Sequence, residues 1–304
     1  MSSFGDRLRS HPLVFEPVPP SARLGRERLA SQVDAVVQTV LANPRIDAIN
    51  VPELVDENHE GRPYYRSGDV RGYARRLAEA TGRETVVNKV VAHLPDRDAL
   101  VRWSMESVAA GIAHAILVGG SSRYIPYPGP PVIEADRICA PIFGAARGRI
   151  GNIAIPQRTG EAHRMVAKTQ AGCAFFTTQI VFDAGPVRTT LTEYASLCAE
   201  ARIRPVPVLL SLAPLADEAD IEFIRWLGAD IPERVEREVL AGGTPAEAAT
   251  RSIELAVELY REVGGGAGGP AVPLGANVEQ VSVRHLPHAA RMAEEFARIL
   301  PARA

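Results

Sequence analysis

The chain has 304 residues, of which 46% are hydrophobic and 23% charged, and its formal net charge is −2. This composition is typical of a globular protein that can bury a sizeable core without disulfides or metals. The near-neutral charge, without a basic stripe of interleaved aromatic residues, excludes nucleic acid and an anionic membrane surface as expected partners. No apolar run approaches the roughly 18 residues needed to span a bilayer.

The cysteines and the N-terminal segment indicate a cellular compartment. Cys139, Cys173 and Cys198 are odd in number and form no CxxC pair, so we expect reduced thiols. The first ten residues, MSSFGDRLRS, contain no apolar signal region. We therefore expect a cytoplasmic protein without a membrane segment.

Short apolar runs alternate with longer amphipathic stretches along the whole chain. The first run, LVFE, is followed by a stretch with Leu29, Val33 and Val37 at helical spacing. A polar loop that contains NHEGRP follows the second run, and Asp96 is the expected N-cap of a later helix. In chain order the predicted strands span residues 13–16, 46–51, 85–94, 114–120, 149–155, 173–183, 205–213 and 269–276. Helices are predicted over 21–41, 70–80, 97–110, 133–145, 160–171, 187–202, 217–227, 231–241, 245–263 and 286–299.

Eight strand–helix units of this length predict a single (β/α)8 barrel, the TIM barrel, that spans residues 1–304. Most of the predicted strands are continuous apolar runs, as expected when both faces of a parallel strand are covered. The alternative is an open, doubly wound sheet. No linker divides the chain into two domains.

Two short motifs do not support the functions that they formally match. GGGAGG (264–269) satisfies G-x-G-x-x-G, but it follows a helix and leads into a strand, the reverse of a dinucleotide fingerprint. HLPH (285–288) has two histidines but no third ligand nearby, which disfavours a zinc site. We expect no bound metal.

Polar residues recur at the predicted C-terminal ends of the strands, where barrel enzymes carry their chemistry. Glu16 ends the first apolar strand and is followed by three prolines, which restrict the exit of the chain. Gln179 lies within the apolar run TTQIVF, where a buried amide needs a hydrogen-bond partner. The other strand ends offer Asn50, Glu53, Asp56, His93, Gly119, Gly120, Ser121, Ser122, Gln157, Arg158, Thr178, Asp183, Ser211, Asn277 and Glu279.

Several stretches resemble the methylenetetrahydrofolate reductase family, over about residues 12 to 300. VFEPVPP (14–20) resembles the family's F-E-F-x-P-P, and HL (93–94) resembles the end of its H-L-T-C strand. KTQAGCAFFTTQIVFD (168–183) resembles K-x-x-A-G-A-x-F-x-x-T-Q-x-x-F-D and is the most specific match. PVPVLLSLAPL is similar to P-V-x-x-G-I-x-P-x more loosely.

The resemblance implies a (β/α)8 barrel that passes a hydride from NADH or NADPH, directly or through FAD, to the methylene group of a reduced folate. It places the family's general acid on Glu16 and its folate-binding glutamine on Gln179, and Asn50 falls where the family's second strand meets ligand. From their positions at strand ends, we also expect Ser121 and Asn277 to bind substrate. The resemblance places His93 and Lys168 on positions that contact a flavin. We also expect Gly119 and Gly120 to bind the cofactor, because glycines let a phosphate approach backbone N–H groups.

Three departures separate the chain from the family's pattern. Where the family has R-G-D, this chain has Gly119-Gly120-Ser121. The family's L-N-R is replaced by Ala276-Asn277-Val278, and its Y-P-E by Ile155-Pro156-Gln157. The lost contacts indicate a divergent branch and favour direct use of NADH without flavin. Two alternatives stay open: a folate- or pterin-binding barrel that transfers a one-carbon group, and a barrel subunit that has lost its activity. A homo-oligomer is compatible with all three.

Overall fold

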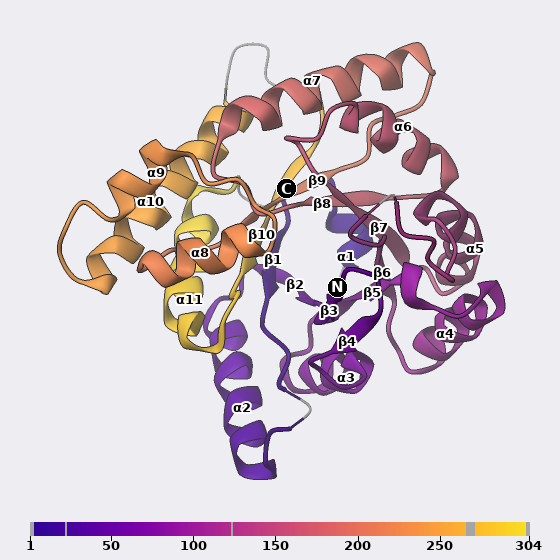
Figure 1. The fold of residues 1–304 in the computed structure, drawn as a ribbon, viewed down its shortest axis with the longest axis horizontal. Helices are drawn as coiled ribbons and strands as arrows, with labels where there is room; N and C mark the ends of the chain where they lie inside the picture. Colours follow the sequence, from indigo (N-terminus) through magenta and orange to yellow (C-terminus); the bar gives the residue numbers. More distant parts are fainter. Residues whose placement is uncertain (1–2, 22, 123, 266–270, 302–304) are drawn as a thin grey trace.

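The computed structural model describes residues 3–21, 23–122, 124–265 and 271–301. Eight parallel strands close into a barrel in the order β1-β10-β9-β8-β7-β6-β5-β2 (Figure 1). This confirms the predicted (β/α)8 barrel and rejects the open sheet. The barrel strands are β1 (Leu13–Glu16), β2 (Ile46–Val51), β5 (Glu84–Val90), β6 (His114–Val118), β7 (Arg149–Ala154), β8 (Phe175–Thr178), β9 (Val208–Leu212) and β10 (Leu274–Glu279).

Helices surround the barrel and bury the outer faces of its strands (Figure 1). Val36, Tyr194 and Phe296 belong to this outer core, which joins the strands to the helices. The helices are α2 (Arg26–Ala42), α3 (Val70–Thr81), α4 (Arg97–Ala109), α5 (Val132–Ala145), α6 (Glu161–Ala171), α7 (Ala184–Glu200), α8 (Glu218–Trp226), α9 (Glu233–Val239), α10 (Pro245–Gly264) and α11 (Leu286–Ile299). No helix in the described ranges is long and apolar enough to cross a membrane.

One end of the barrel interior is filled by apolar side chains. A separate buried cluster brings together residues of six strands with two from the N-terminal segment: Val14, Ala48, Val86, Ile116, Phe175, Leu209, Phe4 and Leu8. Phe4 lies on a short helix that the sequence did not predict, α1 (Phe4–Arg7), and its ring meets that of Phe175 edge to face at 5.9 Å. The N-terminal end of the barrel is therefore closed, which leaves the C-terminal end for polar groups.

Six of the eight predicted strands differ in their limits from the structure, among them β5, β8 and β10, where a candidate site residue moves relative to its strand. β5 stops at Val90 and continues as a 3-10 turn, η1 (Val91–His93), so His93 lies beyond the strand. β8 stops at Thr178, so Gln179 lies beyond the strand, although its N–H still donates to the backbone oxygen of Ala154 on β7. β10 runs to Glu279, whereas residues 269–270 of the predicted strand lie outside the described residues. Proline supplies no N–H to a strand ladder, which explains why regular pairing starts only after Pro273.

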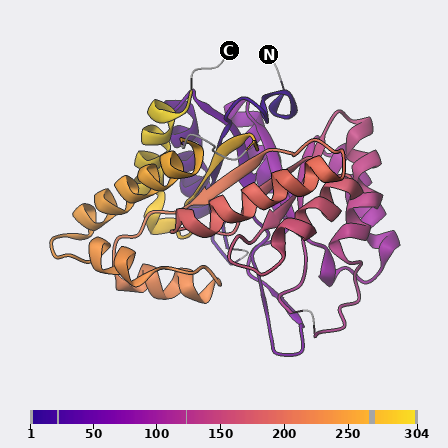
Figure 2. The same ribbon diagram turned by 90° about the horizontal axis from the view of Figure 1, so that it is seen from above.

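The polar loop predicted after the second strand contains a hairpin. β3 (Val55–Glu57) and β4 (Pro63–Tyr65) pair in antiparallel register, joined by a turn with Gly61 at φ 78°. Figure 2 shows the hairpin projecting at the end of the molecule opposite to α1. It therefore stands at the polar, C-terminal end of the barrel.

Candidate functional site

Glu16 lies at the centre of a polar group inside the C-terminal end of the barrel. Its Oε2 accepts hydrogen bonds from Asn50 Nδ2 at 2.6 Å and from Asn277 Nδ2 at 2.7 Å. The three residues come from β1, β2 and β10, which are neighbours in the barrel. The structure thus brings together three of the predicted site residues.

The environment of Glu16 poises its carboxyl group for proton transfer. Burial raises its pKa from the ordinary value, and the hydrogen bonds from Asn277 and Asn50 oppose this by favouring the charged form; the result is a pKa of about 7. A carboxyl group with a pKa near the working pH can act as a general acid.

Glu279 is a second carboxyl group beside Glu16. The two residues are register partners on β1 and β10, so their side chains leave the sheet on the same face. Asn277 Nδ2 lies 3.3 Å from Glu279 Oε1 and 3.1 Å from Ser211 Oγ. Burial and the neighbouring Glu16 charge raise the pKa of Glu279 well above its ordinary value.

Sequence reasoning noted Glu279 at a strand end but gave it no role. The predicted strand ended at residue 276, which left Glu279 in a loop. A signal was present, because Asn277 and Glu279 alternate with Ala276 and Val278 as in a strand with one polar face.

Two amide oxygens next to Glu16 lack partners. Asn50 and Asn277 are 1% and 0% exposed, and within the described residues neither Oδ1 accepts a hydrogen bond. A buried acceptor without a donor costs roughly 1–3 kcal/mol. Both oxygens therefore have unused capacity to accept hydrogen bonds at the polar end of the barrel.

Gln179 lies just beyond β8, at the same end of the barrel as Glu16, with β9 and β10 between their strands. Its Nε2 donates to the backbone oxygen of Leu227 at 2.9 Å, and its Oε1 accepts from the N–H of Ile180 at 3.2 Å. The amide therefore has protein partners, and the described residues include no contact between Gln179 and Glu16. Its role in substrate binding stays a prediction.

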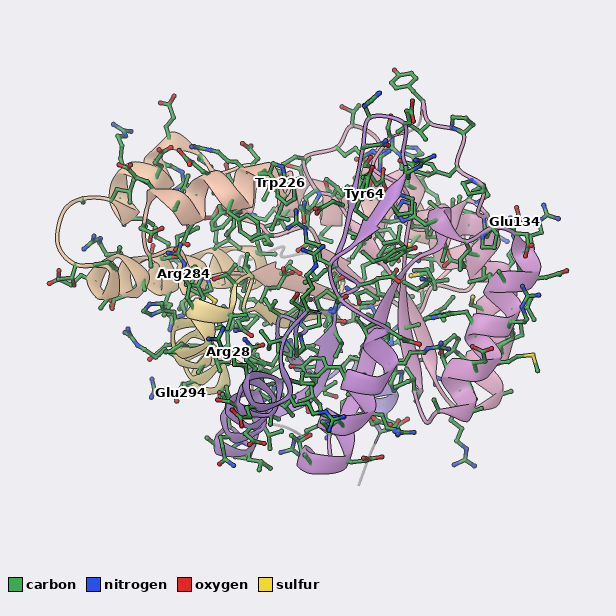
Figure 3. All side chains as sticks on the ribbon, turned by 60° about the horizontal axis from the view of Figure 1, so that its bottom comes forward. Arg28, Tyr64, Glu134, Trp226, Arg284 and Glu294 are labelled. Carbon is green, nitrogen blue, oxygen red and sulfur yellow. The ribbon has the colours of Figure 1, made fainter. Side chains whose placement is uncertain are left out.

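Glu57 joins the hairpin to the loop after β6. Its carboxylate accepts from Ser121 Oγ and Tyr127 OH, each at 2.6 Å, and lies 2.8 Å from His93 Nε2. Burial by itself would raise the pKa of Glu57, but the hydrogen bonds hold it below its ordinary value. Sequence reasoning missed Glu57, which carries no signal in a polar loop. Figure 3 labels Tyr64 on the same hairpin.

Gly119 and Gly120 accommodate side chains of this chain. A Cβ on Gly120 would lie 2.1 Å from the ring of Tyr127, and one on Gly119 would lie 3.2 Å from Val132. Neither glycine has a positive φ. Gly120 is therefore required by the close approach of the Tyr127 ring.

Lys168 lies largely buried behind β7. Its Nζ donates to the backbone oxygen of Ile153 at 2.8 Å and lies 3.9 Å from Glu161 Oε1. Burial lowers its pKa, and the neighbouring Glu161 opposes that shift.

Three of the four residues expected to bind a cofactor have contacts within the chain, and their role in cofactor binding stays a prediction. His93 is bonded to Glu57, the Tyr127 ring covers Gly120, and Lys168 is bonded to the backbone. We therefore build no chemical step on a flavin.

The structure places the two histidines of HLPH but only the start of GGGAGG. His285 of HLPH pairs with Asp220 at 3.0 Å, and no group of three His, Cys, Asp or Glu residues could hold a metal there. GGGAGG falls largely on residues 266–269, which lie outside the described residues.

Comparison with known proteins identifies a structural neighbour but no family. No family model and no curated protein matches the chain. A solved structure, an uncharacterized protein from Clostridium thermocellum that binds two copies of 5-methyl-5,6,7,8-tetrahydrofolic acid, superposes with a TM-score of 0.77. The sequences are 18% identical, and the match covers 97% of this chain and 99% of the other. At this identity the likeness establishes the fold alone.

Proposed function

We propose that this protein reduces 5,10-methylenetetrahydrofolate to 5-methyltetrahydrofolate, with NADH or NADPH as the hydride donor. The observation that carries the proposal is Glu16, held at a pKa of about 7 by its buried position in the C-terminal end of the barrel. The resemblance of VFEPVPP and KTQAGCAFFTTQIVFD to methylenetetrahydrofolate reductases points to the same reaction.

The reaction requires one proton and one hydride. Protonation of the departing nitrogen by Glu16 breaks the C–N bond of the five-membered ring and leaves an iminium ion. Hydride transfer from the reduced nicotinamide to the iminium carbon then forms the methyl group and the oxidised nicotinamide. Glu16 ends as a carboxylate and takes up a proton from solvent before the next turnover.

The residues around Glu16 support the acid step. Both amide donors bond to Oε2, and no hydrogen bond to Oε1 occurs among the described residues. Oε1 is therefore the oxygen that can carry the proton toward a substrate. Held from two strands, the carboxyl group has little rotational freedom, which favours transfer in a fixed direction.

The hydrogen-bonding groups nearby support a pterin. A reduced pterin has an amide edge and an amino group, which donate several N–H bonds. The buried oxygens of Asn50 and Asn277 need such donors, and Gln179 offers a further amide at the rim. The ligand bound by the structural neighbour, 5-methyltetrahydrofolic acid, is the product of the proposed reaction.

The test is incubation of the purified protein with 5,10-methylenetetrahydrofolate and NADH or NADPH. We expect oxidation of the nicotinamide with equimolar formation of 5-methyltetrahydrofolate. The visible spectrum of the same preparation tests for a flavin, which we expect to be absent. Tight binding of either folate with no oxidation of NADH or NADPH would overturn the reductase and favour a folate-binding protein that transfers a one-carbon group.

A further inference from the structure

The chain carries a second, partly buried carboxyl group where the proposed reaction needs only one. Glu16 and Glu279 face each other across β1 and β10 as register partners, and the same nitrogen, Asn277 Nδ2, lies within 2.7 Å of one and 3.3 Å of the other. Like charges directly opposite on neighbouring strands are destabilising. The negative charge of two neighbouring carboxylates must therefore be reduced, either by a nearby cation or by a bound proton.

The part of the chain that the structure describes supplies no cation to the pair. Within it, neither carboxyl group forms an ion pair with lysine, arginine or histidine. The side chains that face the pair from the neighbouring strands are Asn50 on β2, Ser211 on β9 and Asn277 on β10, and none of them titrates near neutral pH. Lys89, on β5, is bonded to Glu53 at 2.6 Å instead.

We propose that Glu16 and Glu279 share one proton at neutral pH and that Glu279 is the positioning residue that keeps Glu16 in its acid form. The inference rests on the proposed function for its catalytic meaning, but the shared proton itself does not depend on any substrate. The donors arranged around the pair match this state. Asn277 can donate to both carboxyl groups, and a proton on either one removes the repulsion between them.

The shared proton also explains why a second carboxyl group, that of the partly buried Glu279, lies beside the general acid. A carboxyl group that has given its proton to substrate becomes charged in a buried site, which is unfavourable. The neighbouring Glu279 makes that charged state still less favourable, and so drives Glu16 to take up a proton again before the next turnover. Neighbouring carboxylates that titrate as a pair have apparent pKa values that belong to both groups.

The decisive variant is Glu279→Gln, which keeps the size and the hydrogen-bonding oxygen but removes the charge. Infrared spectra of the protein without ligand, with glutamate labelled by ¹³C, follow the protonated carboxyl band as the pH rises. In the wild type we expect the pair to lose its protons in two steps, one near the Glu16 pKa of about 7 and one at higher pH, where the shared proton leaves. In Glu279→Gln we expect the upper step to disappear and a single step near the Glu16 pKa of about 7 to remain, because burial and the two asparagines set that value.

A matched control and a reciprocal variant complete the test. Glu60→Gln removes an exposed carboxyl group from the hairpin turn, and should leave the infrared titration and the activity as in the wild type. If Glu279→Gln does not fold, Glu16→Gln measures the same coupling from the other side and should lower the titration of Glu279.

The activity profile links the pair to catalysis. The rate of folate reduction should fall at high pH as Glu16 loses its proton. In Glu279→Gln this fall in rate should occur at a pH about one unit lower. An infrared titration that is the same in wild type and Glu279→Gln overturns the shared proton, even if the wild type reduces folate. Absence of reductase activity with the infrared difference intact overturns the proposed function alone.

Discussion

Asn50 Nδ2 lies 2.6 Å from Glu16 Oε2, although the two residues are 34 positions apart and belong to different strands. The bond joins β2 to β1 at the polar end of the barrel and favours the charged form of the carboxyl group. It therefore acts on the pKa of Glu16 in the direction opposite to burial.

Replacement of Asn50 by alanine should shift the activity profile upward in pH. Loss of the donor raises the pKa of Glu16, so the acid form persists to higher pH, and the alkaline limb of kcat/KM should move up by about half a unit to one unit. The maximal rate should fall, because Glu16 loses one of its two fixed contacts. A limb that moves to lower pH would contradict this role for Asn50.

Replacement of Glu16 by glutamine should leave the fold nearly unchanged and cut turnover at least ~100-fold, the usual scale for a lost general acid. The glutamine side chain keeps an oxygen that can accept from the two asparagines. Steady-state turnover and folate binding are measured side by side, with Glu60→Gln as the control for loss of an exposed carboxyl group. Turnover near that of the wild type would remove Glu16 from the mechanism.

The free energy of unfolding should depend on pH in the way that the raised pKa of Glu16 predicts. Its pKa rises from 4.5 to about 7 on folding, so its favourable contribution is complete below pH 4.5 and is lost as the pH rises to about 7. Relative to Glu16→Gln, the free energy of unfolding of the wild type should fall across this window, by on the order of 3 kcal/mol at most. Denaturant unfolding of both proteins at a series of pH values measures the difference. A difference that rises with pH would show that the carboxyl group is stabilised in its charged form.

Loss of the Glu57 carboxylate should release the β3–β4 hairpin without unfolding the barrel. Glu57→Gln weakens the contacts to Ser121, Tyr127 and His93, which tie the hairpin to the neighbouring loop. Hydrogen exchange should accelerate over residues 55–65 and stay unchanged in β2 and β5. Because the pKa of Glu57 is lowered, acidification of the wild type should produce the same local change as the pH falls through that lowered value. Equal acceleration throughout the barrel would instead indicate a global loss of stability.

The packing of Gly120 against Tyr127 can be tested by a double-mutant cycle. Gly120→Ala places a methyl group against the ring and should destabilise the protein by about 1–3 kcal/mol. In a Tyr127→Ala background the same substitution should cost much less, because the ring is absent. Thermal or denaturant unfolding of the four proteins gives the coupling. Additive effects of the two substitutions would show that the ring yields without strain.

The order of apolar runs and helical stretches determined the barrel. Each run is long enough for one strand and too short for a buried helix, and each is followed by an amphipathic stretch that can cover it. Glu16 and Asn277 were recognisable for the same reason, since a polar residue at the end of an apolar strand stands out. Strand limits were less predictable, because an apolar run can extend past the last strand residue, as Ile180, which packs against α8, does after β8.

Only the tertiary structure decided which of these residues meet. The register of β1 against β10 places Glu16 opposite Glu279, and these strands are joined only when the barrel closes. Likewise, Glu57 meets Tyr127 across 70 positions of sequence. Local sequence encodes which face of a strand a residue occupies. The partner on that face depends on closure and register, which are set by the packing of the whole chain.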